Sequence, residues 1–299
     1  MKSINIVCPV YNEEQCIALF FQEMIKLKKK LIDYNLTLIF TNNDSQDKTY
    51  ELCKKICNEN NWVKLITFTR NFGYQASILC GLKQYQADFY TIVDVDLQDP
   101  PEMIEEFLKI NKEEGFQVVF GNRADRDENF LIKNLRKLYY KIMKKVADQD
   151  FQINMAEFFL ITDEVKKNII NNKNTNIFLR NEVAFTGYKR KGIKFTRQKR
   201  IAGKGVGESF LYMIVYGFSG LVATSTLPLR ISFYAFFPIA VINFLTFFEF
   251  KIIPSVYLNA LNMLFIGYTL SFISIYLARI HKDIVGRPLY IIDYQKSEL

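Results

Sequence analysis

Histidine is nearly absent from this 299-residue sequence, and its scarcity limits the chemistry available to the protein. The single histidine, His281, stands close to the C-terminal end. The 280 residues before it therefore supply neither a Ser-His-Asp triad nor a metal site built from several histidines. Carboxylates and cationic side chains remain as the candidate catalytic groups.

Cysteine is also scarce, with five residues in the whole chain. Cys53 and Cys57 lie one helical turn apart, but no second pair and no nearby histidine completes a zinc site. We therefore expect reduced thiols, as in a cytoplasmic protein. Residues Met1–Val10 lead directly into a strand pattern, which predicts that no signal peptide opens the chain.

The net charge of +8 is not accompanied by the motifs of a nucleic-acid-binding protein. The sequence contains no Gly-aromatic RNA-binding motif and no zinc-finger spacing. An anionic membrane surface and a phosphorylated substrate explain the excess of Lys and Arg equally well. We therefore predict no nucleic-acid partner.

The most informative stretch is Thr91–Glu102, which reads TIVDVDLQDPPE. The apolar run Phe89–Val93 predicts a buried strand, and Asp94 and Asp96 follow where that strand ends. Open α/β sheets bind their ligands at such strand ends. Two carboxylates with the amide of Gln98 offer hard oxygen ligands that suit Mg²⁺ or Mn²⁺. The alternative is an ordinary solvated acidic turn.

Further apolar segments predict the rest of an α/β fold. Strands are expected at Ser3–Val10, Leu36–Phe40 and Val63–Thr67, with a helix from about Tyr74 to Tyr85 before the Phe89–Val93 strand. This alternation of strands and helices predicts a doubly wound, mostly parallel sheet. Another strand is expected to begin at residues 118–120.

The segment that follows the first strand reads VCPVYNEE. An aromatic side chain beside polar groups at a strand end can stack on a base and hold a ribose. Pro9, Tyr11 and Glu13 are therefore candidate substrate-binding residues. Ordinary loop and helix-cap roles are the alternative.

A basic region follows the strand at 118–120. Arg123 and Arg126 are spaced so that both could reach an anion, and guanidinium groups suit phosphate. The next segment, Leu131–Val146, has apolar residues at helical spacing, with Lys and Arg elsewhere around the helix. Its basic face is either simply solvated or lies along a membrane surface.

The C-terminal third is strongly apolar. Phe210–Leu229 is expected to lie at a membrane surface, whereas Ile231–Phe248 and Val256–Ala278 are each long enough to cross a bilayer core of ~30 Å. Basic residues flank the pair, which predicts a cytoplasmic location for the catalytic domain. The expected divisions are a catalytic domain at 1–208, an interfacial helix at 209–230, a transmembrane hairpin at 231–279 and a cytoplasmic tail at 280–299.

The motif DVDLQDPPE closely resembles the DADLQ(D/H)PPE signature of family-2 glycosyltransferases that act on polyprenyl phosphates. This group includes dolichol-phosphate mannose synthase and bacterial bactoprenol glucosyltransferases. The resemblance implies a GT-A fold and an inverting transfer of one sugar from a nucleotide-sugar to a polyprenyl phosphate. It also implies dependence on Mg²⁺ or Mn²⁺ and a multi-pass location in the cell membrane. A homo-oligomer is a possible assembly.

The same resemblance implies roles for individual residues on the donor side. Asp94 would meet the ribose or the metal, and Asp96 and Gln98 would hold the metal against the donor pyrophosphate. The P-x-Y-N-E loop at Pro9–Glu13 would hold the nucleotide. Asn42 stands where relatives use an Asp that accepts a hydrogen bond from the base, and Arg70 belongs to an RNFG motif near the nucleotide.

Four arginines are implied as phosphate ligands, and they are Arg123, Arg126, Arg136 and Arg200. Glu157 would orient the sugar, so we assign Asp94, Asp96 and Glu157 as the catalytic residues. The sequence departs from relatives at Asn42 and Asn43, where Asp is usual, and at Asn154 and Phe159, where Asp and Arg are common. Two alternatives stay open: transfer to another lipid or saccharide acceptor, and a non-catalytic scaffold of the same fold.

Overall fold

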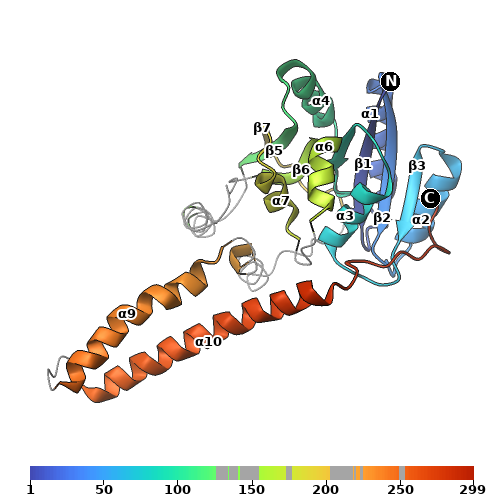
Figure 1. Cartoon of the computed structure of the whole chain (residues 1–299). Helices are drawn as coiled ribbons and strands as arrows, with labels where there is room; N and C mark the ends of the chain where they lie inside the picture. Colours follow the sequence, from blue (N-terminus) through green and yellow to red (C-terminus); the bar gives the residue numbers. More distant parts are fainter. Residues whose placement is uncertain are drawn as a thin grey trace.

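A seven-stranded sheet forms the frame of the N-terminal part of the protein (Figure 1). The computed structural model describes residues 1–125, 134, 141, 155–172, 177–202, 218, 220–222, 225–248 and 253–299. The strand order is β3-β2-β1-β4-β6-β5-β7. The strands are β1 (Lys2–Val10), β2 (Tyr34–Asn42), β3 (Val63–Thr67), β4 (Phe89–Ile92), β5 (Val118–Asp125), β6 (Met155–Thr162) and β7 (Arg190–Thr196).

The predicted mostly parallel sheet is confirmed. The pairs β1–β2, β2–β3, β1–β4 and β5–β7 are parallel, and β6 is antiparallel to both β4 and β5. The first strands are nearly continuous apolar runs because helices cover both of their faces. The carboxyl ends of the parallel strands therefore meet at one edge of the sheet, where β4 delivers the acidic motif.

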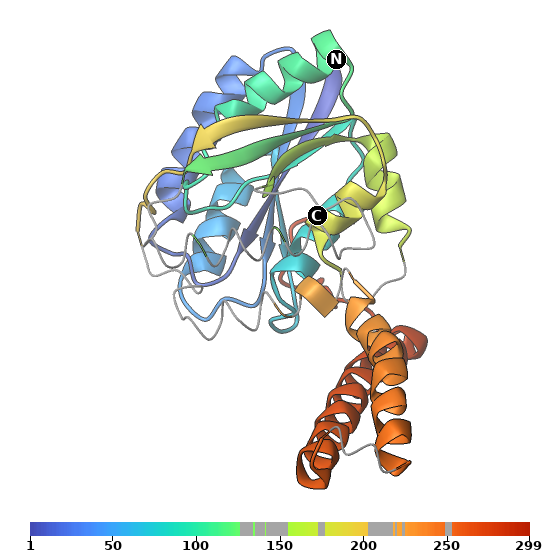
Figure 2. The same ribbon diagram turned by 90° about the vertical axis from the view of Figure 1, so that its left-hand side faces the viewer.

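Helices lie on both faces of the sheet, as expected for a doubly wound fold (Figure 2). On one face, buried apolar residues of three helices pack against the sheet to form a core. These helices are α1 (Ile17–Lys30), α2 (Thr49–Glu59) and α4 (Met103–Glu114). The opposite core takes residues from α3 (Tyr74–Gln84), α6 (Asp163–Ile170) and α7 (Leu179–Phe185). The expected α/β architecture is thus present.

Close packing fixes the position of α3. A Cβ atom at Gly81 would lie 2.4 Å from Cγ1 of Val7 in β1, so only glycine allows this approach of helix and strand. The N-terminal end of α3 carries Tyr74 and Gln75, and both side chains reach the acidic groups described below. The packing of Gly81 therefore helps to set the geometry of the site.

Two long apolar helices form an antiparallel hairpin that projects from the sheet domain (Figures 1 and 2). They are α9 (Leu227–Phe247) and α10 (Ser255–Val285), and both are long and apolar enough to cross a membrane. Asn243 and Asn262 pair across the hairpin through two reciprocal amide hydrogen bonds of 3.0 and 2.9 Å. This pairing satisfies two polar side chains within the largely apolar spans of the two helices.

The helices are longer than the apolar runs that predicted them. α9 begins at Leu227 rather than Ile231, and α10 continues past Ala278 to Val285, where Gly286 ends it with φ of 61°. Charged residues such as Arg279 continue a helix as readily as apolar ones, so hydropathy locates the apolar span but not the helix end. The expected interfacial helix at 209–230 lies largely outside the described residues.

The expected cytoplasmic tail at 280–299 comprises the end of α10 and a segment that returns to the sheet. Residues 280–285 belong to α10, and residues 289–299, named the strap here, return to the outer edge of β3. Leu65 pairs with Glu298 and Phe68 pairs with Ile292, both in antiparallel bridges. Figure 1 accordingly places the C-terminus beside β3 and α2. Hydropathy could not predict this return because the contacts join residues more than 200 positions apart.

Candidate active site

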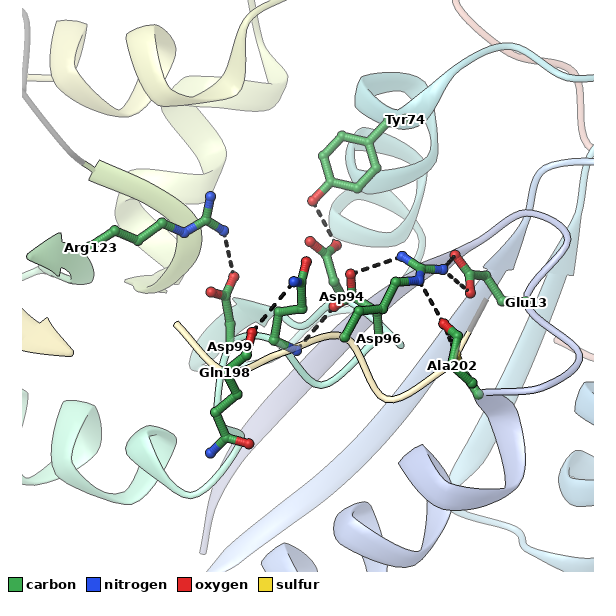
Figure 3. Close-up of polar contacts among 11 residues, drawn as sticks. Glu13, Tyr74, Asp94, Asp96, Asp99, Arg123, Gln198 and Ala202 are labelled. Atoms are coloured by element: carbon green, nitrogen blue, oxygen red, sulfur yellow. Dashed lines mark hydrogen bonds and ion pairs between the residues drawn. The ribbon is translucent and has the colours of Figure 1, made fainter. Parts of the chain in front are cut away.

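Asp94 and Asp96 lie in the loop directly after β4, where the backbone bends sharply (Figure 3). Leu97 adopts a left-handed φ of 54°, which turns the chain back at this point. Asp94 accepts a hydrogen bond of 2.8 Å from the Tyr74 hydroxyl, and Asp96 accepts one of 3.1 Å from the Gln98 backbone N–H. The bend fixes both carboxylates at the same edge of the sheet.

Negative charge is concentrated at this loop. Burial, together with the neighbouring carboxylates of Asp96 and Asp99, raises the pKa of Asp94 to about 7, whereas the hydrogen bond from Tyr74 opposes the shift. A divalent cation would relieve this charge. The described residues hold no ready-made group of three or more acidic, Cys or His ligands. Two carboxylates still fit Mg²⁺ or Mn²⁺, because Mg²⁺ in particular keeps several water or phosphate ligands.

The loop Arg197–Ala202, named the lid here, follows β7 and lies over the acidic loop. Its backbone joins that loop through Gln198 N–H to Gln98 O at 2.9 Å, and Gln98 Nε2 donates back to Gln198 O at 3.4 Å. The Arg200 guanidinium donates to Asp96 Oδ2 at 3.0 Å and to both carboxylate oxygens of Glu13. The structure therefore brings together three of the predicted residues, Glu13, Asp96 and Arg200.

Two further arginines, Arg123 and Arg197, lie beside the acidic residues. Arg123 in β5 donates to Asp99 Oδ2 at 2.7 Å, and both side chains are almost fully buried. Arg197 lies close enough for the Arg123 charge to act on it: burial lowers the Arg197 pKa, and Arg123 lowers it further. The Nε atoms of Arg123 and Arg197 are buried without a hydrogen-bond partner. The cluster therefore has spare donors and positive charge for an anion.

Glu157 belongs to a polar group on the α3 and α7 side of β6. Gln75 Nε2 donates to its two carboxylate oxygens at 2.9 and 3.1 Å, and Arg180 Nε donates to Oε1 at 3.1 Å. Gln75 in turn accepts from the Leu179 N–H at 3.0 Å, which ties α3 to α7. Glu157 is 7% exposed, so its carboxylate is held in one orientation.

Sequence reasoning did not single out Tyr74, Gln75, Arg180 or Arg197. Tyr74 and Gln75 follow the RNFG motif directly, and Arg180 lies in the FLR stretch at 178–180. Arg197 lies in the basic run at 188–200. The motifs were therefore visible, but only the fold shows which of their side chains reach the acids.

The departures at the end of β2 have structural consequences. Asn42 Oδ1 accepts from the Ser45 N–H at 3.1 Å, so the oxygen expected to meet a base is bonded within its own loop. Asn43 donates to Asn71 Oδ1 at 2.8 Å and accepts from the Phe72 N–H at 2.8 Å. The next residue, Asp44, has a left-handed φ of 59°, a conformation that Gly adopts without strain.

Tyr11 lies next to this region, because Val10 pairs with Asn42 in the sheet. Tyr11 is 39% exposed, which leaves its ring accessible for stacking on a base. Pro9 lies inside β1 and is buried, so it shapes the strand end rather than presenting a side chain to a ligand. Arg70 is exposed, with its guanidinium 4.1 Å from the centre of the Phe72 ring.

The remaining predicted residues fall into two groups. Arg126 and Arg136, expected to bind phosphate, lie outside the described residues, as does Asn154. Phe159, which replaces a common arginine, is fully buried in the core on the α3, α6 and α7 face. Phe159 therefore serves as a packing residue of this core.

Comparison with known proteins gives a consistent result. The model of the family described as "Glycosyl transferase family 2" matches residues 5–185. The chain is 31% identical to the uncharacterized glycosyltransferase YkcC of Bacillus subtilis, over 98% of this chain and 93% of that protein. It is 27% identical to the bactoprenol glucosyl transferase of Shigella phage SfX, over 98% and 99% of the two chains.

A solved structure supports the fold assignment. The mannosyltransferase PcManGT from Pyrobaculum calidifontis, in complex with GDP-Man and Mn²⁺, matches with a TM-score of 0.51 and 13% identity, covering 95% of this chain and 87% of that one. The GT-A fold expected from the sequence is thus confirmed. The family match spans more than half of the chain and includes the acidic motif of β4, so the protein belongs to glycosyl transferase family 2.

Proposed function

We propose that the protein transfers a single sugar from a nucleotide-sugar to a polyprenyl phosphate, with inversion at the sugar carbon. The observation that carries the proposal is the close association of acidic and cationic groups at one edge of the sheet. Asp94 and Asp96 offer a site for a metal-bound pyrophosphate, while Arg123, Arg197 and Arg200 offer cations for phosphate. Relatives named bactoprenol glucosyl transferase support a polyprenyl acceptor.

On the donor side, Asp94, Asp96 and Gln98 would hold Mg²⁺ or Mn²⁺. The bound cation would neutralise the nucleoside diphosphate as it leaves. Arg200 already bonds to Asp96, so binding of metal and donor requires this guanidinium to exchange its carboxylate partner for a phosphate. The lid would then close over the pyrophosphate rather than over the bare acids. The exposed ring of Tyr11 would stack on the base.

On the acceptor side, Arg123 and Arg197 would bind the lipid phosphate. Their unpartnered Nε atoms supply donors that the protein itself leaves unused. A phosphate monoester has a second pKa of about 6, so its oxygen is largely ionised at pH 7 and attacks without a strong general base. Glu157, fixed by Gln75 and Arg180, would instead orient the sugar hydroxyls.

Inversion follows from the direction of attack. The phosphate oxygen of the acceptor would approach the sugar carbon from the side opposite the leaving nucleoside diphosphate. One bond forms from that oxygen to the carbon as the bond to the diphosphate breaks. An α-linked donor would therefore give a β-linked sugar phosphate on the lipid.

Membrane attachment would hold the enzyme beside its acceptor. The hairpin α9–α10 suits a two-span anchor in the cell membrane, with the catalytic domain and the C-terminal strap both on the cytoplasmic side. Confining enzyme and lipid to one surface raises the effective concentration of the acceptor. The hairpin would act as an anchor and not as a path for the sugar.

The test is analysis of the lipid product by mass spectrometry. Purified protein, Mn²⁺, a panel of nucleotide-sugars and undecaprenyl phosphate should yield a lipid with one sugar joined through one phosphate, together with free nucleoside diphosphate. Release of the diphosphate should require the lipid. A lipid bearing several sugars, a sugar joined through a diphosphate, or no transfer from any donor would contradict the proposal.

A further inference from the structure

The strap connects the membrane hairpin to the nucleotide side of the site. α10 ends at Gly286, and only Gly286–Pro288 separate it from the strap, a span of roughly 10 Å when extended. Along β3 the strap makes hydrogen bonds that include Glu298 N–H to Leu65 O at 2.7 Å and Asp293 N–H to Thr67 O at 2.8 Å. The part of β3 from Leu65 to Thr67 is therefore held by the chain that leaves the membrane helix.

The strap also reaches beyond β3 into the loop that follows it. The Thr69 N–H donates to Ile291 O at 3.1 Å, which fixes the first residue after Phe68. The Tyr290 ring stacks on Phe68 with centroids 5.3 Å apart and planes 9° from parallel. Phe68 in turn meets Phe72 edge-on, with centroids 5.8 Å apart.

The loop held in this way contacts the site at two points. The Phe72 N–H donates to Asn43 Oδ1, and Asn71 Oδ1 accepts from Asn43 Nδ2, so the loop is bonded to the end of β2. Directly after the loop, Tyr74 donates to Asp94. The contacts therefore run without a break from α10 through Tyr290 and Phe68 to the groups around the acidic motif.

We infer that the strap is a positioning element for the donor site, with Tyr290 as its main anchor. The inference rests on the proposed function only in taking the donor to be a nucleotide-sugar. Docking of the strap holds the Thr69–Gly73 loop in the arrangement that keeps Asn43 and Tyr74 in place. Nucleotide binding and strap docking are then coupled, and each strengthens the other.

The first experiment measures amide hydrogen exchange of the full-length protein in detergent. Tyr290→Ala should accelerate exchange at Leu65, Thr67 and Thr69 and throughout the loop at 70–73. Tyr290→Phe keeps the ring that stacks on Phe68 and loses only the hydrogen bond between the hydroxyl and Cys80, so exchange in the 70–73 loop should stay close to that of the wild type. Tyr294→Ala is the matched control, because Tyr294 lies in the same strap but is 70% exposed.

The second experiment measures binding of UDP and, separately, GDP in the presence of Mn²⁺. Tyr290→Ala should weaken binding of the preferred nucleotide roughly two- to tenfold, the equivalent of one lost aromatic pair. The turnover rate at saturating donor should change much less than the donor KM. In the wild-type protein, binding of the nucleotide should slow hydrogen exchange at the Asp293 and Glu298 amides. This measurement requires no substitution.

Two results would overturn the inference. One is faster exchange in β3 alone, with the 70–73 loop and nucleotide affinity unchanged, which would make the strap a simple cover for the sheet edge. The other is exchange at Asp293 and Glu298 that does not respond to a nucleotide that binds. If the wild type binds neither nucleotide, the donor part of the proposed function fails, and exchange in the 70–73 loop alone decides the role of the strap.

Discussion

Replacement of Asp96 by Asn tests the proposed metal site. The substitution preserves size and shape, and the Asn oxygen can still accept the hydrogen bond from the Gln98 N–H. It removes the charge that pairs with Arg200 at 3.0 Å. It also removes one of the two carboxylates that would hold the cation. We therefore expect a small effect on folding and a large effect on metal binding.

The cost in stability follows from the contacts of Arg200. The Asp96 and Arg200 side chains are 10% and 19% exposed, so their ion pair is only partly screened by water. A hydrogen bond between charged groups contributes about 1.5–3 kcal/mol. Because Glu13 continues to hold Arg200, we expect a loss at the lower end, about 1.5–2 kcal/mol, and a fall in Tm of about 3–8 °C.

The cost in turnover should be far larger. Loss of a group that merely supports a metal ligand typically costs 10- to 100-fold, so loss of a ligand carboxylate should cost roughly 100-fold or more. The assay titrates Mn²⁺ against release of nucleoside diphosphate, with Mn²⁺ binding followed separately by electron paramagnetic resonance. Glu105→Gln in α4 is the control, because it removes an exposed carboxylate close to the same motif. Turnover and Mn²⁺ affinity equal to those of the wild type would refute the metal assignment.

Three further predictions concern the membrane hairpin and the core. With an impermeant thiol reagent on intact cells, Ser255→Cys should be labelled, and Lys54→Cys only after permeabilisation; labelling of both from one side would exclude the two-span topology. Asn243→Leu should lower the stability of the hairpin by about 0.6–1.7 kcal/mol because it leaves Asn262 unpaired. In the Asn243→Leu background, Asn262→Leu should lower stability less than it does in the wild type, as measured by thermal unfolding in a double-mutant cycle. Phe159→Arg, which restores the residue common in relatives, should destabilise the protein by about 3–5 kcal/mol by placing an unpaired charge in the core; a folded variant of unchanged Tm would show that this site accommodates a cation.

Much of the fold could be predicted because the centres of its first strands are apolar runs. β3 begins and ends where the pattern places it, whereas β2 extends to both sides of Leu36–Phe40, from Tyr34 to Asn42. The added residues are polar or aromatic, and they join the strand through backbone pairing with β1. Hydropathy does not record that pairing, so strand ends are less predictable than strand centres.

The candidate site was predictable to the extent that its residues lie in compact motifs. Asp94 and Asp96 could be selected from one short stretch of sequence. The partners of these acids could not, since Tyr74 lies 20 residues before Asp94 and Arg200 lies 104 residues after Asp96. Contacts of this kind depend on how β4, α3 and the lid meet at one edge of the sheet, which local periodicity does not determine.

The two outer strands of the sheet are protected from intermolecular pairing in different ways. An outer strand with free N–H and C=O groups is a template for another copy of the chain. The strap occupies that position along β3. β7 instead carries Arg190, Lys191 and Lys194, whose like charges repel a second identical strand. Copies crowded together on a membrane surface would therefore resist aggregation by sheet extension, and their catalytic domains would remain separate folding units.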